Sequence, residues 1–183
     1  MRGGGEDSWI CTNGSWVQHG HPRAAKPIVP CPKKVTSMSL TSTEFMDGAD
    51  LPAKYSCNGT SASPPFTIMG VPAAAKSLAL VLEDPDAPNG VYTHLLTWNI
   101  DPKTKDVQQD QIPSGAVMGS NSAGNPGLMP PCPLSGTHRY VYTLYALDAM
   151  LSLPTGATKK EFDLASAAHK IAATSLMSRY KKP

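Results

Sequence analysis

The chain has 183 residues, of which 40% are hydrophobic, and its formal net charge at pH 7 is +2. This length is enough for one domain with a sizeable core, and so small a net charge excludes the dense basic field that marks nucleic-acid-binding proteins. No apolar run approaches the roughly 20 residues that a membrane-spanning helix needs, so no transmembrane segment is expected. The 18 prolines and 15 glycines favour short elements and shaped loops over long helices.

The first 37 residues differ in composition from the rest, because they contain two of the three tryptophans and two of the four cysteines. The string WICTNGSWV predicts a small hairpin around Asn13 and Gly14, and the prolines that follow predict an extended linker. We therefore expect an appendage over residues 1–37 and a main domain over residues 38–183. The opening string MRGGGEDSW has no apolar segment of the secretory type, so no leader is expected in this chain.

The four cysteines, Cys11, Cys31, Cys57 and Cys132, allow three disulfide pairings, and the sequence does not choose among them. A Cys11–Cys31 bond would close the appendage and stabilise it by about 3 kcal/mol on a loop-entropy basis. Cys57 and Cys132 would then form a long-range bond in the main domain. The even count favours an oxidising compartment, and the alternative is four unrelated reduced thiols in a cytosolic protein. No CxxC motif supports zinc.

The sequence of the main domain predicts mainly β-strands. The run KSLALVLED predicts a strand buried on both faces, because its five central residues are all apolar. HLLTWNI (94–100) predicts a second strand with His94, Leu96 and Trp98 on one face.

A third strand is predicted for HRYVYTLYALD (138–148), which is rich in Tyr, Val and Thr. Its alternation places His138, Tyr140, Tyr142 and Leu144 on one face. The long connection over residues 119–136 is rich in proline and glycine, and loops of this length usually have a function.

One helix is predicted in TKKEFDLASAAHK. Thr158 and Glu161 have the spacing of a capping box, and the narrow apolar stripe consists of Phe162, Ala165 and Ala168. The alternation in the following ATSLMSRYKK predicts a return to strand. The coarse picture is a β domain with a helix at one edge.

Ionisable side chains mark the ends of the predicted strands. Asp84 and Asp86, in LEDPDAPNG, follow the first strand, and His94 and His138 open the second and third. If these strands are neighbours, two carboxylates and two imidazoles meet at one end of a sheet. An imidazole N–H donates to phosphoryl or carboxylate oxygens, and an aspartate fixes its tautomer or accepts from an ammonium. The pattern predicts a site for a small anion or zwitterion.

Each of these residues has a simpler interpretation. The two aspartates would also suit a rigid turn, and His94 would also suit an ordinary half-buried position. Two Asp and two His are compatible with a divalent metal, although their spacing matches no metal motif. Ser135 with His138 and an Asp would make a hydrolase triad, but the Gly-x-Ser-x-Gly elbow is absent.

The strings DGADLPAKYSCNGTSASPPFTIMGVPAAAKSLALVLEDPDAPNG, THLLTWNI and GTHRYVYTLYALD resemble the phosphatidylethanolamine-binding protein (PEBP) family, in particular its bacterial and archaeal Raf kinase inhibitor-like branch. The resemblance covers roughly residues 38–182. It implies a mainly β, PEBP-like fold, with a large central antiparallel sheet packed on a smaller sheet and a C-terminal helix near the pocket. It also implies a non-enzymatic binding or regulatory protein, without a cofactor, whose small pocket takes phosphate-like anions or phospholipid head groups.

The pocket lining that the resemblance implies consists of Asp84, Asp86, His94, Pro133, His138 and Tyr140. One aspartate would orient the pocket and the other would be available to a cationic head group, with Asp84 ranked first. The chain departs from the family pattern at four positions around the pocket mouth, namely Tyr92, Thr93, Leu128 and Leu134. Head-group preference is therefore not carried over.

The resemblance also implies a Cys57–Cys132 bond, as in exported members of the branch, and hence an extracytoplasmic (periplasmic or secreted) location; the alternative is cytoplasmic. Two other functions stay open. One is a protease or kinase inhibitor that acts through its surface, with residues 9–31 supplying the contact. The other is an enzyme that uses His94 and His138 as acid and base.

Overall fold

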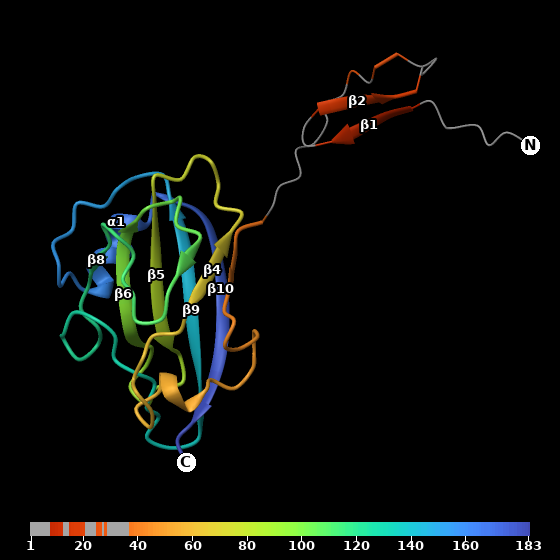
Figure 1. Ribbon diagram of the computed structural model, residues 1–183. Coiled ribbons are helices and arrows are strands. Elements are labelled where there is room, and N and C mark those ends of the chain that lie inside the picture. The colour runs from red at the N-terminus through yellow and green to blue at the C-terminus, as the bar shows by residue number, and fades with distance from the viewer. Residues whose placement is uncertain (1–7, 13–14, 21–24, 27, 29–36) are drawn as a thin grey trace, which may run out of the picture. The chain divides into compact units, whose positions relative to one another are not determined.

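The computed structural model describes residues 8–12, 15–20, 25–26, 28 and 37–183. The chain divides into two compact units, residues 1–36 and 37–183, and each is described by itself. In the first unit, β1 (Ser8–Thr12) and β2 (Ser15–His19) pair in antiparallel fashion (Figure 1), which is the hairpin expected from WICTNGSWV. The predicted Cys11–Cys31 bond and the linker after the hairpin fall outside the described residues.

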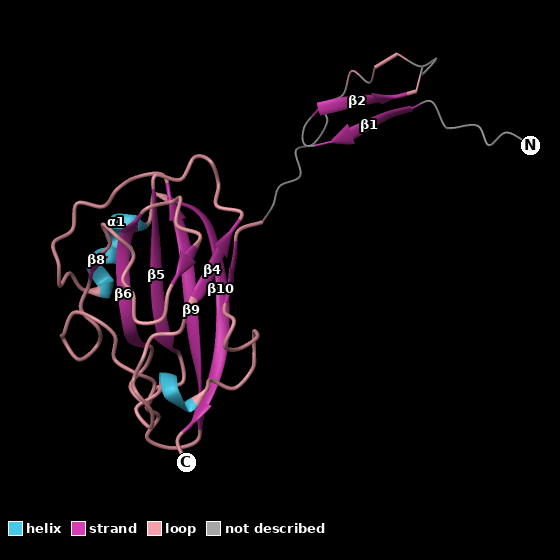
Figure 2. Ribbon diagram, in the orientation of Figure 1, coloured by secondary structure: helices cyan, strands magenta, loops and turns pink. Residues whose placement is uncertain are grey.

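The second unit is built from two antiparallel sheets (Figure 2). The larger has the strand order β10-β9-β5-β6-β8, and its strands in chain order are β5 (Ser77–Asp84), β6 (Tyr92–Ile100), β8 (Val117–Met118), β9 (Thr137–Leu147) and β10 (Lys170–Lys181). The smaller has the order β3-β4-β7, with β3 (Ser39–Thr41), β4 (Phe66–Met69) and β7 (Asp106–Val107). A short 3₁₀ helix, η1 (Ala53–Tyr55), and one α-helix, α1 (Lys159–Ser166), complete the elements. This is the predicted mainly β fold with two sheets.

The central strand β5 is buried on both faces, as predicted. Leu78, Leu80 and Leu82 pack into a core shared with the smaller sheet. Ala79 and Val81 point the other way, into a second core that α1 completes. Because both faces of a central strand are removed from water, every one of these positions has to be apolar.

Strand β9 alternates as predicted. Its buried residues include His138, Tyr140, Tyr142 and Leu144, whereas the residues between them are half-buried or exposed. Tyr140, Tyr142 and Leu144 belong to the core between the two sheets. The face of β9 that carries His138 is therefore the face that meets the smaller sheet.

Helix α1 begins with the predicted capping box. The Thr158 Oγ1 accepts from the backbone N–H of Glu161 (3.3 Å), and the Glu161 carboxylate accepts from the backbone N–H of Thr158 (2.7 Å). Phe162 is fully buried, but the helix ends at Ser166, so Ala168 lies beyond it and is exposed, contrary to the predicted stripe.

The position of α1 also differs from the expectation. It covers the face of the larger sheet opposite the smaller sheet, where Phe162 packs with Trp98. It is neither at an edge nor at the pocket described below, because burying Phe162 requires the sheet face. No helix among the described residues is long and apolar enough to cross a membrane.

Candidate functional site

Strand β6 contains an extra residue at His94. Leu82 lies opposite Leu95 on the neighbouring strand, and the next residue, Glu83, lies opposite Thr93. One step along β5 therefore corresponds to two steps along β6, and His94 has no partner on β5. A bulge of this kind redirects side chains, and bulges are frequent beside functional sites.

The bulge sends the His94 ring to the face opposite the one predicted. Its ring packs edge-on against Tyr140, with the centroids 5.3 Å apart, whereas Leu96 and Trp98 pack in the core that contains α1. The predicted common face of His94, Leu96 and Trp98 is wrong, because simple alternation does not continue through a bulge.

A pocket of about 610 Å³ lies where β5 ends and where β6 and β9 begin. Five of the six predicted ligand residues line it, namely Asp84, His94, Pro133, His138 and Tyr140. All five are buried, although they come from three strands and one loop. The antiparallel order β9-β5-β6 brings the strand ends together, as the expectation required.

Asp84 and His138 form a buried pair in the pocket wall. The Asp84 Oδ2 accepts from the His138 Nδ1 at 2.7 Å, and the Asp84 Oδ1 accepts from the backbone N–H of Asp86 at 2.8 Å. The exposed fractions of the two paired side chains are only 5% and 11%. Because Nδ1 carries the proton that Asp84 binds, Nε2 is the His138 nitrogen left for a ligand. Among the described residues, the hydrogen bond of the His138 ring is the one through Nδ1.

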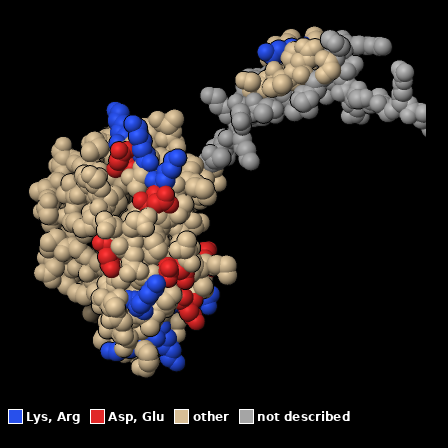
Figure 3. Space-filling model, viewed as in Figure 1, with Lys and Arg blue, Asp and Glu red and all other residues tan. Residues whose placement is uncertain are grey.

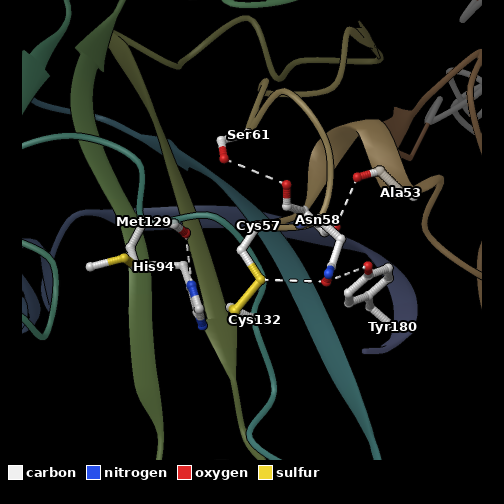
Figure 4. The surroundings of a disulfide bond; sticks show 9 residues. Ala53, Cys57, Asn58, Ser61, His94, Met129, Cys132 and Tyr180 are labelled. Atoms are coloured by element: carbon white, nitrogen blue, oxygen red, sulfur yellow. Dashed lines mark hydrogen bonds between the residues drawn. A yellow bond between two sulfur atoms is a disulfide. The ribbon is translucent and has the colours of Figure 1, made fainter. Parts of the chain in front are cut away.

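His94 is held by the backbone of the long loop. Its Nδ1 lies 2.8 Å from the carbonyl oxygen of Met129 (Figure 4) and must donate, because a carbonyl only accepts. Burial lowers the pKa of His94, and the Met129 carbonyl and the Asp84 charge oppose this only partly. At neutral pH the ring is therefore uncharged, and its Nε2 carries a lone pair.

Aromatic side chains flank the two histidines. Tyr92 packs against His94 with the ring centroids 4.8 Å apart. Burial raises the pKa of Tyr140, so its hydroxyl stays protonated. That hydroxyl lies beside the backbone of Cys132, but it makes no hydrogen bond of good geometry within the described part of the chain.

Backbone hydrogen bonds and a disulfide fix the loop over residues 119–136 to the body of the unit near the pocket. The backbone N–H of Met129 donates to the carbonyl of His94 (2.8 Å). A disulfide joins Cys132 to Cys57 across 75 positions in the sequence, with the Cα atoms 5.4 Å apart, and the Cys57 N–H donates to the carbonyl of Pro131 (3.0 Å). Figure 4 shows His94 beside this disulfide. The predicted Cys57–Cys132 pairing is present.

Two residues that organise this loop were missed in the sequence. The buried Asn121 accepts from the backbone N–H of Ala123 (2.9 Å) and donates to the carbonyl of Gly127 (3.2 Å). Ser122, which lines the pocket, accepts from the backbone N–H of Thr93 (2.8 Å). The signal was available in GSNSAGNPG, since Asn and Ser are the residues whose side chains most often bond nearby backbone.

The structure does not bring Asp86 to the pocket. Its carboxylate receives three hydrogen bonds from Arg139, from the backbone N–H (2.9 Å), Nε (2.9 Å) and Nη2 (2.7 Å). These bonds lower the pKa of Asp86 to about 2. Asp86 is thus fully occupied by a cation of its own chain, and only Asp84 turns toward the pocket.

The four residues that depart from the family pattern lie in different environments. Tyr92 lines the pocket, and Leu134 lines its mouth with 87% of its surface exposed. Leu128 instead packs against the core between the sheets, and Thr93 is buried outside the lining. Leu128 therefore does not shape the mouth as expected.

The described residues do not support a hydrolase triad or a metal site. Ser135 is exposed and does not line the pocket, so it is not positioned as a nucleophile beside His138. Among the residues that the structure describes, no three His, Cys, Asp or Glu side chains are grouped so that they could hold a metal ion.

Comparison with known proteins identifies the family. A family model described as phosphatidylethanolamine-binding protein matches residues 41–181. A UPF0098 protein of Methanothermobacter thermautotrophicus is 40% identical over 150 residues, which cover 79% of this chain and 99% of the relative. The candidate lipoprotein LppC of Mycobacterium tuberculosis is 39% identical over 150 residues, covering 76% and 74% of the two chains. The crystal structure of a PEBP homologue, CT736 of Chlamydia trachomatis, superposes with a TM-score of 0.78 at 41% identity, covering 80% of this chain and 99% of that one. The chain belongs to the phosphatidylethanolamine-binding protein family.

Proposed function

We propose that this protein binds a phosphate-like anion, free or as a phospholipid head group, in the pocket lined by Asp84, His94, Pro133, His138 and Tyr140. The observation that carries the proposal is the buried Asp84–His138 pair, whose free Nε2 is the part of the pair that a ligand can reach. When His138 is protonated, Asp84 balances its charge, and the ring presents an N–H to the ligand. A hydrogen bond between a charged imidazolium and an oxyanion is among the stronger ones in proteins.

The placement of Asp86 favours an anion over a cation. Two carboxylates facing the same ligand would repel it, but Asp86 is neutralised by Arg139 outside the pocket lining. The single carboxylate that remains is paired with His138. A cationic head group would find no second, unpaired carboxylate among the lining residues.

Calorimetric titration with inorganic phosphate, phosphoethanolamine and phosphoserine tests the proposal. Saturable binding to the wild type should be lost in His138→Ala. His169→Ala is the matched control, because His169 forms the same kind of pair with Asp148 (2.8 Å), but half-exposed and outside the pocket. Absence of binding to the wild type, or equal loss in both variants, would contradict the proposal.

Family membership makes this a binding-type protein, and we infer that it has no catalytic step of its own. Hydrolysis of a phosphoester by the purified protein that disappears in His138→Ala would overturn this inference. The alternative, an inhibitor that acts through residues 9–31, gains no support from the contacts described for that segment.

Partners and location follow from charge and from the disulfide. Acidic and basic residues intermingle over the described face in Figure 3, which suits a small-molecule ligand better than nucleic acid.

The Cys57–Cys132 bond and the relative named as a candidate lipoprotein support an extracytoplasmic location. Thiol labelling of protein taken directly from cells tests this, since a cytoplasmic protein would present both thiols reduced.

A further inference from the structure

A second cavity, of about 240 Å³, lies between the two sheets. Its walls come from strands of both sheets, among them β5 and β6 of the larger and β4 and β7 of the smaller, and from the loops around residues 61–64, 110–113 and 127–128. It shares no lining residue with the pocket at the ends of β5, β6 and β9. The two spaces are therefore separate sites.

The floor of this cavity is apolar and belongs to the protein core. Its residues are at most 7% exposed and all pack in the core between the sheets, namely Phe66, Leu80, Ile100 and Val107. Protein interiors are close-packed, and voids larger than a water molecule are few. An engineered apolar cavity of about 150 Å³ binds benzene, so this one has room for a substituted ring.

One polar group faces the cavity without a partner. Thr97 lies directly opposite Leu80 on the neighbouring strand, so the two side chains share a face of the sheet. Thr97 is 3% exposed, and its Oγ1 has no hydrogen bond to any described residue. No other residue of the lining has an unpartnered buried side-chain oxygen or nitrogen of this kind among the described residues.

The Thr97 hydroxyl is better matched by a ligand than by a trapped water. A buried water needs roughly two to four polar partners, and the side chains of the floor are apolar apart from Thr97. A buried hydroxyl that stays without a hydrogen bond costs stability. A ligand with an apolar body and one polar group would satisfy both the hydroxyl and the floor.

The charge of the lining favours an uncharged ligand. Asp110 is the only charged lining residue, and it is exposed, unlike the floor. Its Oδ1 accepts from the backbone N–H of Ser63 (2.7 Å), and the Ser63 Oγ accepts from the backbone N–H of Asp110 (3.0 Å). These reciprocal bonds hold the loop in place beside the cavity. An ion on the apolar floor would meet no opposite charge there, and its burial would be costly.

We propose that the cavity between the sheets binds a small uncharged molecule, a single substituted ring or a short branched chain, whose one polar group pairs with the Thr97 hydroxyl. This site is independent of the anion-binding function proposed above.

NMR titration of the wild type with p-cresol and with toluene tests the site without a substitution. Methyl signals of Leu80 and Ile112, which line the cavity, should shift saturably with either ligand. Signals of Val81 are the matched control, because Val81 follows Leu80 in β5 but points into the other core. Unmoved Leu80 and Ile112 signals, or equal shifts at Val81, would overturn the proposal.

Thr97→Val tests the ligand class, because valine keeps the side-chain shape and removes the hydroxyl. The ratio of p-cresol affinity to toluene affinity should fall at least about fivefold. Thr143→Val is the control, since Thr143 is half-buried on β9 and outside the cavity, and it should keep the wild-type ratio. An unchanged ratio in Thr97→Val would overturn the assigned ligand class.

The stability of Thr97→Val gives a second readout. Because the hydroxyl has no partner, its removal should leave the urea unfolding midpoint unchanged or raise it. A clear drop would mean that the hydroxyl is already bonded within the protein, which contradicts the proposal.

His138→Ala separates this site from the anion pocket. The variant should bind p-cresol like the wild type, and inorganic phosphate should not displace p-cresol from either protein. Loss of p-cresol binding in His138→Ala would place the ligand in the other pocket and overturn the inference, whereas failure of phosphate binding alone would leave it standing.

Discussion

Asp84 and Asp86 are two residues apart, yet they belong to different environments. Asp84 is 3% exposed and joins His138 in the pocket wall. Asp86 lies outside the pocket lining, and its carboxylate binds Arg139, whose own side chain is 54% exposed. We call Asp86 and Arg139 the rim pair. Each aspartate reaches a neighbouring residue of β9, His138 or Arg139, and alternation along β9 sends those two residues to opposite faces.

Burial, rather than residue type, distinguishes the Asp84–His138 pair of the proposed ligand site from the Asp86–Arg139 pair. A buried ion pair loses much when one partner is removed, whereas an exposed pair is screened by solvent and contributes little.

Removing the disulfide should have the largest effect. The double variant Cys57→Ser/Cys132→Ser removes the covalent link between Cys57 and the loop that lines the pocket, and on loop entropy the unfolding free energy should fall by about 4 kcal/mol. Ligand affinity should fall as well, because Met129, whose carbonyl holds the His94 ring, belongs to this loop and lines the pocket. Urea unfolding and calorimetry measure the two effects, and an unchanged unfolding midpoint would contradict the prediction.

Asp84→Ala should destabilise the protein by about 3 kcal/mol, because it leaves buried His138 without its partner. Asp86→Ala is the matched variant on the rim, and its cost should stay below about 1 kcal/mol. Urea unfolding at pH 7 compares the two. Equal losses would mean that the two environments do not differ energetically.

His94 should make the protein sensitive to mild acid. Burial lowers the pKa of His94 in the folded state, whereas in the unfolded chain histidine titrates near 6.5. As the pH falls below about 6.5 the unfolded state therefore gains a proton that the folded state does not, and stability decreases. Between pH 7 and pH 5, His94→Gln should lose less stability than the wild type in thermal unfolding. Parallel curves for the two proteins would contradict this.

The rim pair should respond only to strong acid, and with the smallest effect. The pKa of Asp86 is about 2 in the folded state and about 3.9 for an unfolded aspartate. Its contribution is therefore complete above about pH 4 and is lost as the pH falls toward 2. The stability difference between the wild type and Asp86→Asn, at most about 1 kcal/mol at pH 7, should shrink over that interval. A difference that persists at pH 2 would argue against the Arg139 clamp.

Much of the fold was predictable because its signals are local. The apolar run of β5, the alternation in β9 and the Thr158–Glu161 capping box each depend on residues close in the sequence. The family resemblance supplied the arrangement of the sheets and the pairing of Cys57 with Cys132, which local patterns do not determine.

The finer features of the site depend on register and could not be predicted. The orientation of His94 follows from a bulge that is visible only once β6 is paired with β5. The partner of Asp86 lies 53 positions away, so local turn chemistry gave no hint that Arg139 would remove it from the pocket. The end of α1 at Ser166 was missed because Ala167 and Ala168 are good helix formers.

The most direct test of the account is titration of inorganic phosphate into three proteins, the wild type, Asp84→Ala and Asp86→Ala, at pH 6.5. If the buried Asp84–His138 pair is the anion site, the wild type and Asp86→Ala should bind one equivalent with affinities within about twofold, and Asp84→Ala should show no saturable heat. Retained binding in Asp84→Ala, or its loss in Asp86→Ala, would contradict the account.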